Sequence, residues 1–156
     1  MSQRVVLEAQ DTVRVAPDHV RQWFMELDSH PERYRFDTHA GFAFISGSFG
    51  EVGARFQTQE RFRGIPVTLR FELTGLGKDG IYFRLIRPAL PVWGAFVIGQ
   101  AKDGTATLSL QVGENAPNAA WFLELPLVRS AVQNQISGEI AHIKSSIESI
   151  FPPPQP

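Results

Sequence analysis

The fold is decided by residues 121–150, which read WFLELPLVRSAVQNQISGEIAHIKSSIESI. Apolar side chains recur in this segment every three or four residues, the spacing that places them on one face of an α-helix. A stripe of this length needs a broad apolar surface to cover it, and the preceding residues must supply that surface. The stripe consists of Trp121, Leu125, Val128, Val132, Ile136, Ile140, Ile143, Ile147 and Ile150.

The beginning of this helical segment differs from its remainder. Pro126 either kinks the helix or marks the start of its main part, because proline has no backbone N–H to donate. Phe122, Leu123 and Leu127 are apolar but lie outside the stripe. They are buried beneath loops, form a mobile lid, or make a patch that contacts a membrane or a second subunit. The opposite face of the helix is expected to be solvated, and it carries Gln133, Asn134, Glu139, Lys144 and Glu148.

The residues before the helix predict a multi-stranded antiparallel sheet. From residue 41 onward the hydrophobic period is two, and glycines separate or end most of the alternating runs. The Asp-Gly pairs at 79–80 and 103–104 are typical of hairpin turns. The expected order is a strand at 5–15, short helices at 19–27 and 32–36, strands at 42–46, 53–62, 67–76, 80–87, 92–101 and 105–112, and the long helix. This order predicts an α+β fold in which a curved seven-stranded antiparallel sheet wraps around the C-terminal helix and encloses a cavity.

Composition narrows the class of protein. A chain of 156 residues with 43% hydrophobic and 20% charged residues is typical of one soluble domain, expected at 1–151 and followed by a disordered Pro-rich tail at 152–156. The formal net charge of −1 gives no argument for nucleic-acid binding. There is no cysteine, no signal-peptide pattern and no apolar run of the roughly 20 residues that span a bilayer. We therefore expect a cytoplasmic protein without a transmembrane segment.

Several segments resemble the SRPBCC superfamily, the START-like or Bet v 1-like proteins with a helix-grip fold. They are Val15-Ala16-Pro17, the helix with Val20, Trp23 and Phe24, the DSHPERY segment at 28–34, the Asp103-Gly104-Thr105 turn and the C-terminal helix. These diffuse patterns span nearly the whole chain. The resemblance implies a hydrophobic cavity between sheet and helix. Members of this superfamily bind lipids, sterols, polyketides or plant hormones, and some are cyclases or dehydratases.

Strand alternation predicts which side chains face the cavity. On the inward face it places two ionisable residues, Glu60 and Arg87, among apolar neighbours. Either a strand end or a bulge turns each of them to solvent, or they are polar anchors in an apolar pocket. Trp93 begins a strand whose two faces are both apolar, which leaves its direction open. The candidate ligand-binding residues are Phe56, Thr58, Glu60, Leu69, Phe71, Phe83, Leu85, Arg87, Trp93, Trp121, Leu125 and Val128.

Three functions follow from these patterns. The first is a carrier or sensor of a hydrophobic small molecule such as a lipid or polyketide. The second is a cyclase, dehydratase or hydrolase, in which Glu60 or an Asp37–His39 pair acts as general acid or base. The third is contact of the 121–127 patch with a membrane surface, a partner or a second copy in a homodimer. The four histidines have no zinc-type spacing, and we predict neither a metal nor a cofactor.

Overall fold

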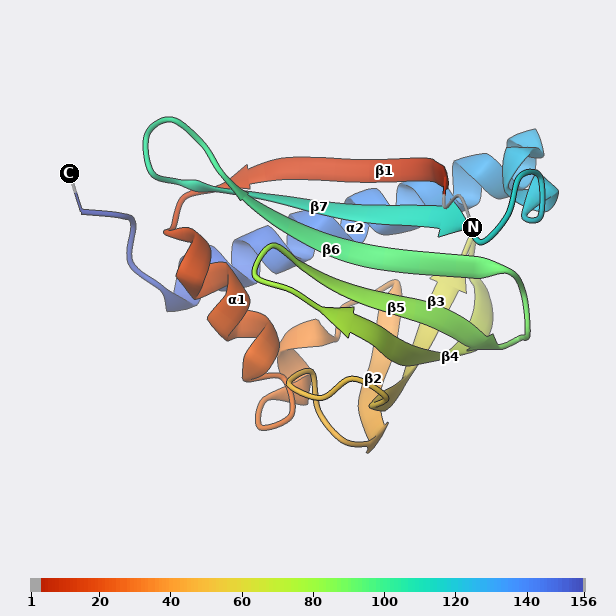
Figure 1. The fold of residues 1–156 in the computed structure, drawn as a ribbon, viewed down its shortest axis with the longest axis horizontal. Coiled ribbons are helices and arrows are strands. Elements are labelled where there is room, and N and C mark those ends of the chain that lie inside the picture. The colour runs from red at the N-terminus through yellow and green to blue at the C-terminus, as the bar shows by residue number, and fades with distance from the viewer. Residues whose placement is uncertain (1–3, 156) are drawn as a thin grey trace.

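Seven strands form one antiparallel sheet that curls around a long helix (Figure 1). The structure is a computed structural model that describes residues 4–155. The strand order is β1-β7-β6-β5-β4-β3-β2, so that β1 and β2 lie at the two edges. The elements are β1 (Arg4–Val13), α1 (Pro17–Met25), η1 (Pro31–Tyr34), β2 (His39–Ser46), β3 (Arg55–Phe62), β4 (Ile65–Leu76), β5 (Gly80–Arg87), β6 (Val92–Gln100), β7 (Ala106–Glu114), η2 (Trp121–Glu124) and α2 (Pro126–Ile150).

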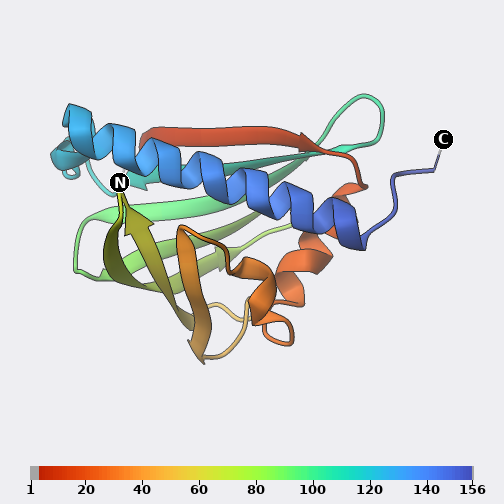
Figure 2. The ribbon, with the colours of Figure 1, turned by 180° about the vertical axis from the view of Figure 1, so that it is seen from behind.

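The predicted architecture is confirmed. Figure 2 shows α2 lying across the sheet next to β1, with α1 and η1 packed at the end where α2 finishes. The two short helices expected after the first strand are α1 and the 3₁₀ turn η1. Pro126 is the first residue of α2 and follows the separate 3₁₀ turn η2. It therefore marks the start of the main helix and does not kink it. Its missing N–H costs nothing there, because the first turn of a helix has no carbonyl to pair with it.

The interior has a filled end and a hollow end. Near α1 the aromatic side chains pack against one another: the ring centroids of Phe24 and Phe96 are 4.6 Å apart, and Tyr34 stacks on Phe42 at 5.0 Å. The second half of α2 covers this end with Ile140, Ile143 and Ile147, which are all buried. The first half of α2 lies over the hollow end, where the candidate site is found.

Two further expectations concern the chain ends and membranes. Within residues 4–155, no helix combines the length and the apolar character required for a bilayer span. Residues 152–155 of the predicted tail have neither helix nor strand, and Pro156 lies outside the described residues.

Candidate functional site

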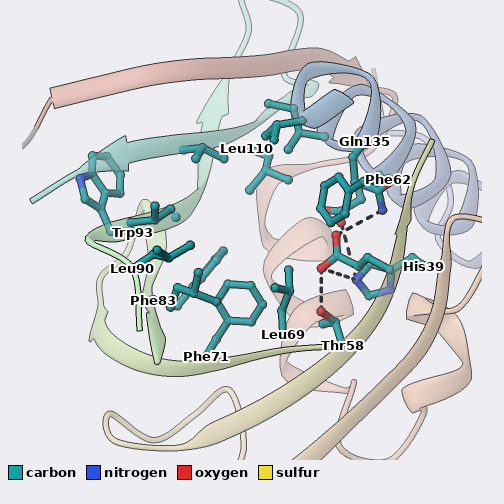
Figure 3. A pocket seen from close by; sticks show the side chains of 18 of the residues that line it. His39, Thr58, Phe62, Leu69, Phe71, Phe83, Leu90, Trp93, Leu110 and Gln135 are labelled. Atoms are coloured by element: carbon teal, nitrogen blue, oxygen red, sulfur yellow. Dashed lines mark hydrogen bonds and ion pairs between the residues drawn. The ribbon is translucent and has the colours of Figure 1, made fainter. Parts of the chain in front are cut away.

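A cavity of about 210 Å³ lies between the concave face of the sheet and the first half of α2 (Figure 3). Strands β3 to β7 line it on one side, and η2 and α2 line it on the other. In Figure 3, Leu69, Phe71 and Phe83 form its middle, with Trp93 and Leu90 at one end. His39, Thr58 and Gln135 lie together at the other end. The cavity therefore has an apolar body and a polar end.

Most of the candidate residues lie around this cavity. Trp93 is among them, and its indole N–H donates to the backbone oxygen of Glu114 at 3.0 Å. Phe122 and Leu123 also line the cavity, so this part of the segment around Pro126 forms a cavity wall. Whether these residues bind a ligand remains a prediction. The candidates that line the cavity are Phe56, Thr58, Glu60, Leu69, Phe71, Phe83, Leu85, Trp93 and Val128.

Three candidate residues lie outside the cavity. Arg87 was expected on the inward face, but it is exposed. Its backbone lies opposite that of Arg70 in the neighbouring strand β4. A register shift between Arg70 and Phe71 gives β5 one extra residue, which reverses the alternation beyond Leu85. Trp121 and Leu125 point to solvent, with 63% and 45% of their surfaces exposed.

Three ionisable side chains meet at the polar end of the cavity. His39 comes from β2, Glu60 from β3 and Glu139 from α2, and one ligand atom of each lies within 4.8 Å of the others. The exposed fractions of these residues are only 1%, 6% and 5%. No lysine or arginine of the described chain lines the cavity. Two carboxyl groups therefore share a buried site without a basic counterion.

Hydrogen bonds hold each member of this cluster in place. Thr58 Oγ1 donates to Glu60 Oε2 at 2.6 Å, and Gln135 Nε2 donates to Glu60 Oε1 at 3.2 Å. The Tyr34 hydroxyl donates to Glu139 Oε2 at 3.2 Å. His39 Nδ1 lies 2.7 Å from the backbone oxygen of Tyr34, which can only accept, so that Nδ1 carries the proton.

The surroundings of the cluster change its acid–base properties. Burial, together with the negative charge of Glu60, raises the pKa of Glu139 well above its usual value. Burial lowers the pKa of His39, an effect larger than the opposing influence of Glu60, and His142 lowers it further. Burial and the charges of Glu139 and Glu60 raise the pKa of Tyr34. A neutral imidazole and a crowded pair of carboxyl groups are the expected state.

The strand pattern correctly predicted that Glu60 faces inward, but the position predicted for Glu139 was wrong. We expected Glu139 on the solvated face of the helix, yet its side chain is buried. Its position gives a signal: it follows Ile136 by three residues and precedes Ile143 by four, which places it beside the apolar stripe. For a glutamate at such a position the sequence predicts a solvent-exposed side chain, because charged residues are rarely buried.

The predicted Asp37–His39 pair does not form. Asp37 is exposed, whereas His39 is buried and turned toward Glu60 and Glu139. A register shift between His39 and Gly41 interrupts the alternation at the start of β2, so that a period of two could not show that His39 faces inward. His142 of α2 is half-buried and stacks on Phe36.

The comparisons with known proteins agree with the architecture. No protein-family model matches the sequence, and no curated protein matches it. Among solved structures, the KanY protein covers 95% of this chain and is itself covered over 99%, with a TM-score of 0.72 and 9% identity. Ara h 8.0201 covers 95% of the chain and is covered over 99%, with a TM-score of 0.65 and 15% identity.

A third structure shows the same fold in a larger protein. The di-domain ARO/CYC protein StfQ, from the steffimycin biosynthetic pathway, covers 93% of this chain with a TM-score of 0.62 and 18% identity. This chain matches 51% of that protein's length. Identities this low speak for the fold alone. The seven-stranded curled sheet, the long C-terminal helix and these structural neighbours together show that the chain has the helix-grip fold of the Bet v 1-like, or SRPBCC, proteins.

Proposed function

We propose that this protein binds a hydrophobic small molecule in the cavity between the sheet and α2. The observation that carries the proposal is a mainly apolar cavity that ends in a buried polar cluster. Pockets with this combination of an apolar lining and a few convergent polar groups are typical of small-molecule sites. The volume of about 210 Å³ favours a compact ligand.

The polar end narrows the chemistry of the ligand. A fully apolar molecule placed against Glu60 and Glu139 would leave buried carboxyl groups without solvent, which is unfavourable. We therefore propose a ligand with an apolar body and a polar group at one end. Its body would contact Leu69, Phe71 and Phe83, and burial would contribute about 25 cal/mol per Å² of apolar surface.

A variant that fills the cavity tests this proposal. Leu69 faces the cavity from β4, and Leu69→Trp would occupy its middle. We expect the variant to bind N-phenyl-1-naphthylamine, a neutral probe with a large apolar body and one N–H group, at least about tenfold more weakly, a loss of roughly 1.4 kcal/mol. Probe fluorescence measures the binding, and circular dichroism checks the fold.

The matched control is Thr68→Trp, which introduces the same indole at the neighbouring, exposed position of β4. This control should bind the probe as the unchanged protein does. Equal affinity of the Leu69→Trp variant and the unchanged protein would contradict binding in this cavity.

Catalysis in the same cavity is the second candidate function. Glu60, His39 and Glu139 face a space that can hold a substrate, and such groups can transfer protons in a cyclase or dehydratase reaction. The test is conversion of a ligand recovered from the purified protein. Loss of conversion in Glu60→Gln with ligand binding retained would support an enzyme, whereas a ligand that stays unchanged in the unmodified protein would support a carrier.

Contact with a membrane surface is a third candidate. Trp121 and Leu127 expose 63% and 70% of their surfaces, and Leu125 lies between them in sequence. Exposed apolar side chains grouped in this way are typical of interaction surfaces. Sedimentation with liposomes should fall in the Trp121→Ser/Leu127→Ser variant if the contact exists.

Homodimer formation, the cytoplasmic location and the single domain at 1–151 stay predictions.

A further inference from the structure

The second ring nitrogen of His39 lies close to two carboxyl groups but hydrogen-bonds to neither. Its Nδ1 donates to the backbone oxygen of Tyr34, so that its Nε2 carries a lone pair. This lone pair points at carboxyl oxygens, with Glu139 Oε1 at 3.6 Å and Glu60 Oε2 at 4.0 Å. Both distances exceed the length of a hydrogen bond.

These distances are too long for a shared proton, but they suit a shared ion. A proton between an imidazole nitrogen and a carboxyl oxygen would bring the two atoms to about 2.7–2.9 Å. Two ligand atoms that each lie roughly 2.0–2.2 Å from one metal ion stand about 3.0–3.6 Å apart at tetrahedral or adjacent octahedral angles. The separation of 3.6 Å between His39 and Glu139 fits this range, and a small rotation of the Glu60 carboxyl group from 4.0 Å would reach it.

The charges also favour a divalent cation. Two carboxylates and a neutral imidazole carry a charge of −2 when ionised, and no lysine or arginine of the described chain lines the cavity. An ion of charge +2 would neutralise the site. Without such an ion, burial of two carboxylates next to one another is costly, since each loses its hydration.

The groups around the cluster are arranged as they are around many metal ligands. Histidine ligands usually donate their second ring N–H to a carbonyl or carboxylate, as His39 does to the oxygen of Tyr34. The ligating carboxylates are usually hydrogen-bonded in turn. Here Tyr34 donates to Glu139, and Thr58 and Gln135 donate to Glu60. Tyr34 donates to Oε2 of Glu139 and leaves Oε1 facing His39, whereas Thr58 donates to the same Oε2 of Glu60 that lies 4.0 Å from His39.

We propose that His39, Glu60 and Glu139 form a binding site for a divalent transition-metal ion at the polar end of the cavity. One nitrogen and two carboxylate oxygens suit zinc, manganese or ferrous iron, whereas calcium and magnesium prefer sites built from oxygen alone. Three protein ligands leave at least one coordination position open. Because the cavity adjoins the site, an oxygen atom of a ligand would take that position. The metal site itself does not depend on an apolar ligand being bound.

Zinc binding to the chelator-treated protein provides the test. Isothermal titration should show one Zn²⁺ per chain, and a thermal melt should show a higher melting temperature with Zn²⁺. Glu60→Gln and Glu139→Gln keep the shape of the side chain but remove a strong ligand. We expect each to weaken Zn²⁺ binding by more than about 100-fold, because loss of a group that merely supports a ligand already costs 10–100-fold.

The matched control is His30→Gln. It removes an exposed histidine whose Nδ1 lies 3.4 Å from Oε1 of Glu32. Its zinc affinity and stoichiometry should equal those of the unchanged protein. Zinc binding that survives in Glu139→Gln, or that is lost in His30→Gln, would overturn the proposal.

A second measurement uses the unchanged protein and does not depend on the folding of a variant. Substoichiometric Mn²⁺ broadens NMR signals close to the ion. The signals of Thr58 and the side-chain amide of Gln135, both bonded to Glu60, should disappear before those of His30 and Glu32. Broadening at His30 and Glu32 first, or no selective broadening, would contradict the proposed site. Failure of the metal test leaves probe binding by the cavity intact, and the Leu69→Trp result is independent of added metal.

Discussion

At the scale of single residues, Glu139 is a buried carboxyl group that we expect to lower the stability of the fold. It lies beside Glu60 without a basic partner, and its Tyr34 hydrogen bond needs only an acceptor. Glu139→Gln keeps an acceptor oxygen and removes the charge repulsion. In chelator-containing buffer at neutral pH we expect a gain of about 1–2 kcal/mol, or about 2–8 °C in melting temperature.

Calorimetry of Glu139→Gln and of the exposed control Glu51→Gln measures this gain. The control should melt at the temperature of the unchanged protein. A lower melting temperature for Glu139→Gln would mean that the carboxyl group stabilises the fold. The gain, if found, would indicate that the residue is present for binding or catalysis.

Glu114, unlike Glu139, is a carboxyl group that we expect to stabilise the folded protein. Desolvation alone would raise its pKa, but backbone N–H groups of Ala120 and Asn118 and the guanidinium of Arg4 hydrogen-bond to its carboxylate, and the resulting pKa is below the usual value. A lowered pKa means that the folded protein holds the carboxylate more tightly than the unfolded chain does. This stability is complete above the usual glutamate pKa of about 4.3 and is lost as the pH falls through the lower folded value.

Glu114→Gln should therefore lower the melting temperature at pH 7. The difference from the unchanged protein should shrink as the pH falls below about 4, since both side chains are then uncharged. Thermal melts between pH 2 and pH 7 check this expectation. A difference that stays constant over this range would show that charge has no part in the role of Glu114.

At the scale of elements, two glycines offer a contrast between helix and sheet. A methyl group added at Gly138 in α2 meets nothing within 4 Å, whereas at Gly113 in β7 it would lie 2.4 Å from the backbone oxygen of Arg4. Gly138→Ala should stabilise the protein by about 0.5–1 kcal/mol, because alanine favours the helix. Gly113→Ala should destabilise it by at least about 1 kcal/mol, because β1 and β7 must separate. Chemical denaturation measures both changes.

The elements were predictable where one hydrophobic period holds without interruption. In β3 the side chains of Phe56, Thr58 and Glu60 are buried as the alternation predicts. In α2 the middle of the predicted stripe is buried, at Ile136, Ile140, Ile143 and Ile147, whereas its ends at Trp121, Leu125 and Ile150 are exposed. Prediction failed where a bulge shifts the period, as at Arg87 in β5 and His39 in β2. The sequence pattern cannot show which strand positions are doubled, since that depends on the partner strand.

The polar cluster was less predictable than the sheet. Its three ionisable members come from β2, β3 and α2, and only the folded sheet brings residues 39, 60 and 139 together. Glu60 was found because it interrupts an apolar row. Glu139 was missed because a charged residue beside a helical stripe is solvated in most proteins.

At the scale of the whole molecule, the cavity should couple ligand binding to stability. A ligand that binds only the folded protein adds RT ln(1 + [L]/Kd) to the free energy of unfolding, which is about 2.7 kcal/mol at a hundredfold excess over Kd. For a chain of this length we expect a rise of roughly 5–11 °C in melting temperature. Differential scanning fluorimetry with a set of apolar molecules carrying one polar group measures this rise.

The same screen with Leu69→Trp gives the comparison that assigns the effect to the cavity. Ligands that stabilise the unchanged protein should leave this variant unaffected. Equal stabilisation of both proteins would place the binding elsewhere on the surface.

The position of α2 after all seven strands also sets an order for synthesis. His39 and Glu60 leave the ribosome well before Glu139, which belongs to a helix that follows all the strands. Until then the hollow of the sheet has no cover and the polar cluster lacks one of its three members. We therefore expect a nascent chain that has formed only its strands to bind neither an ion nor an apolar molecule in this site, so that loading follows the synthesis of α2.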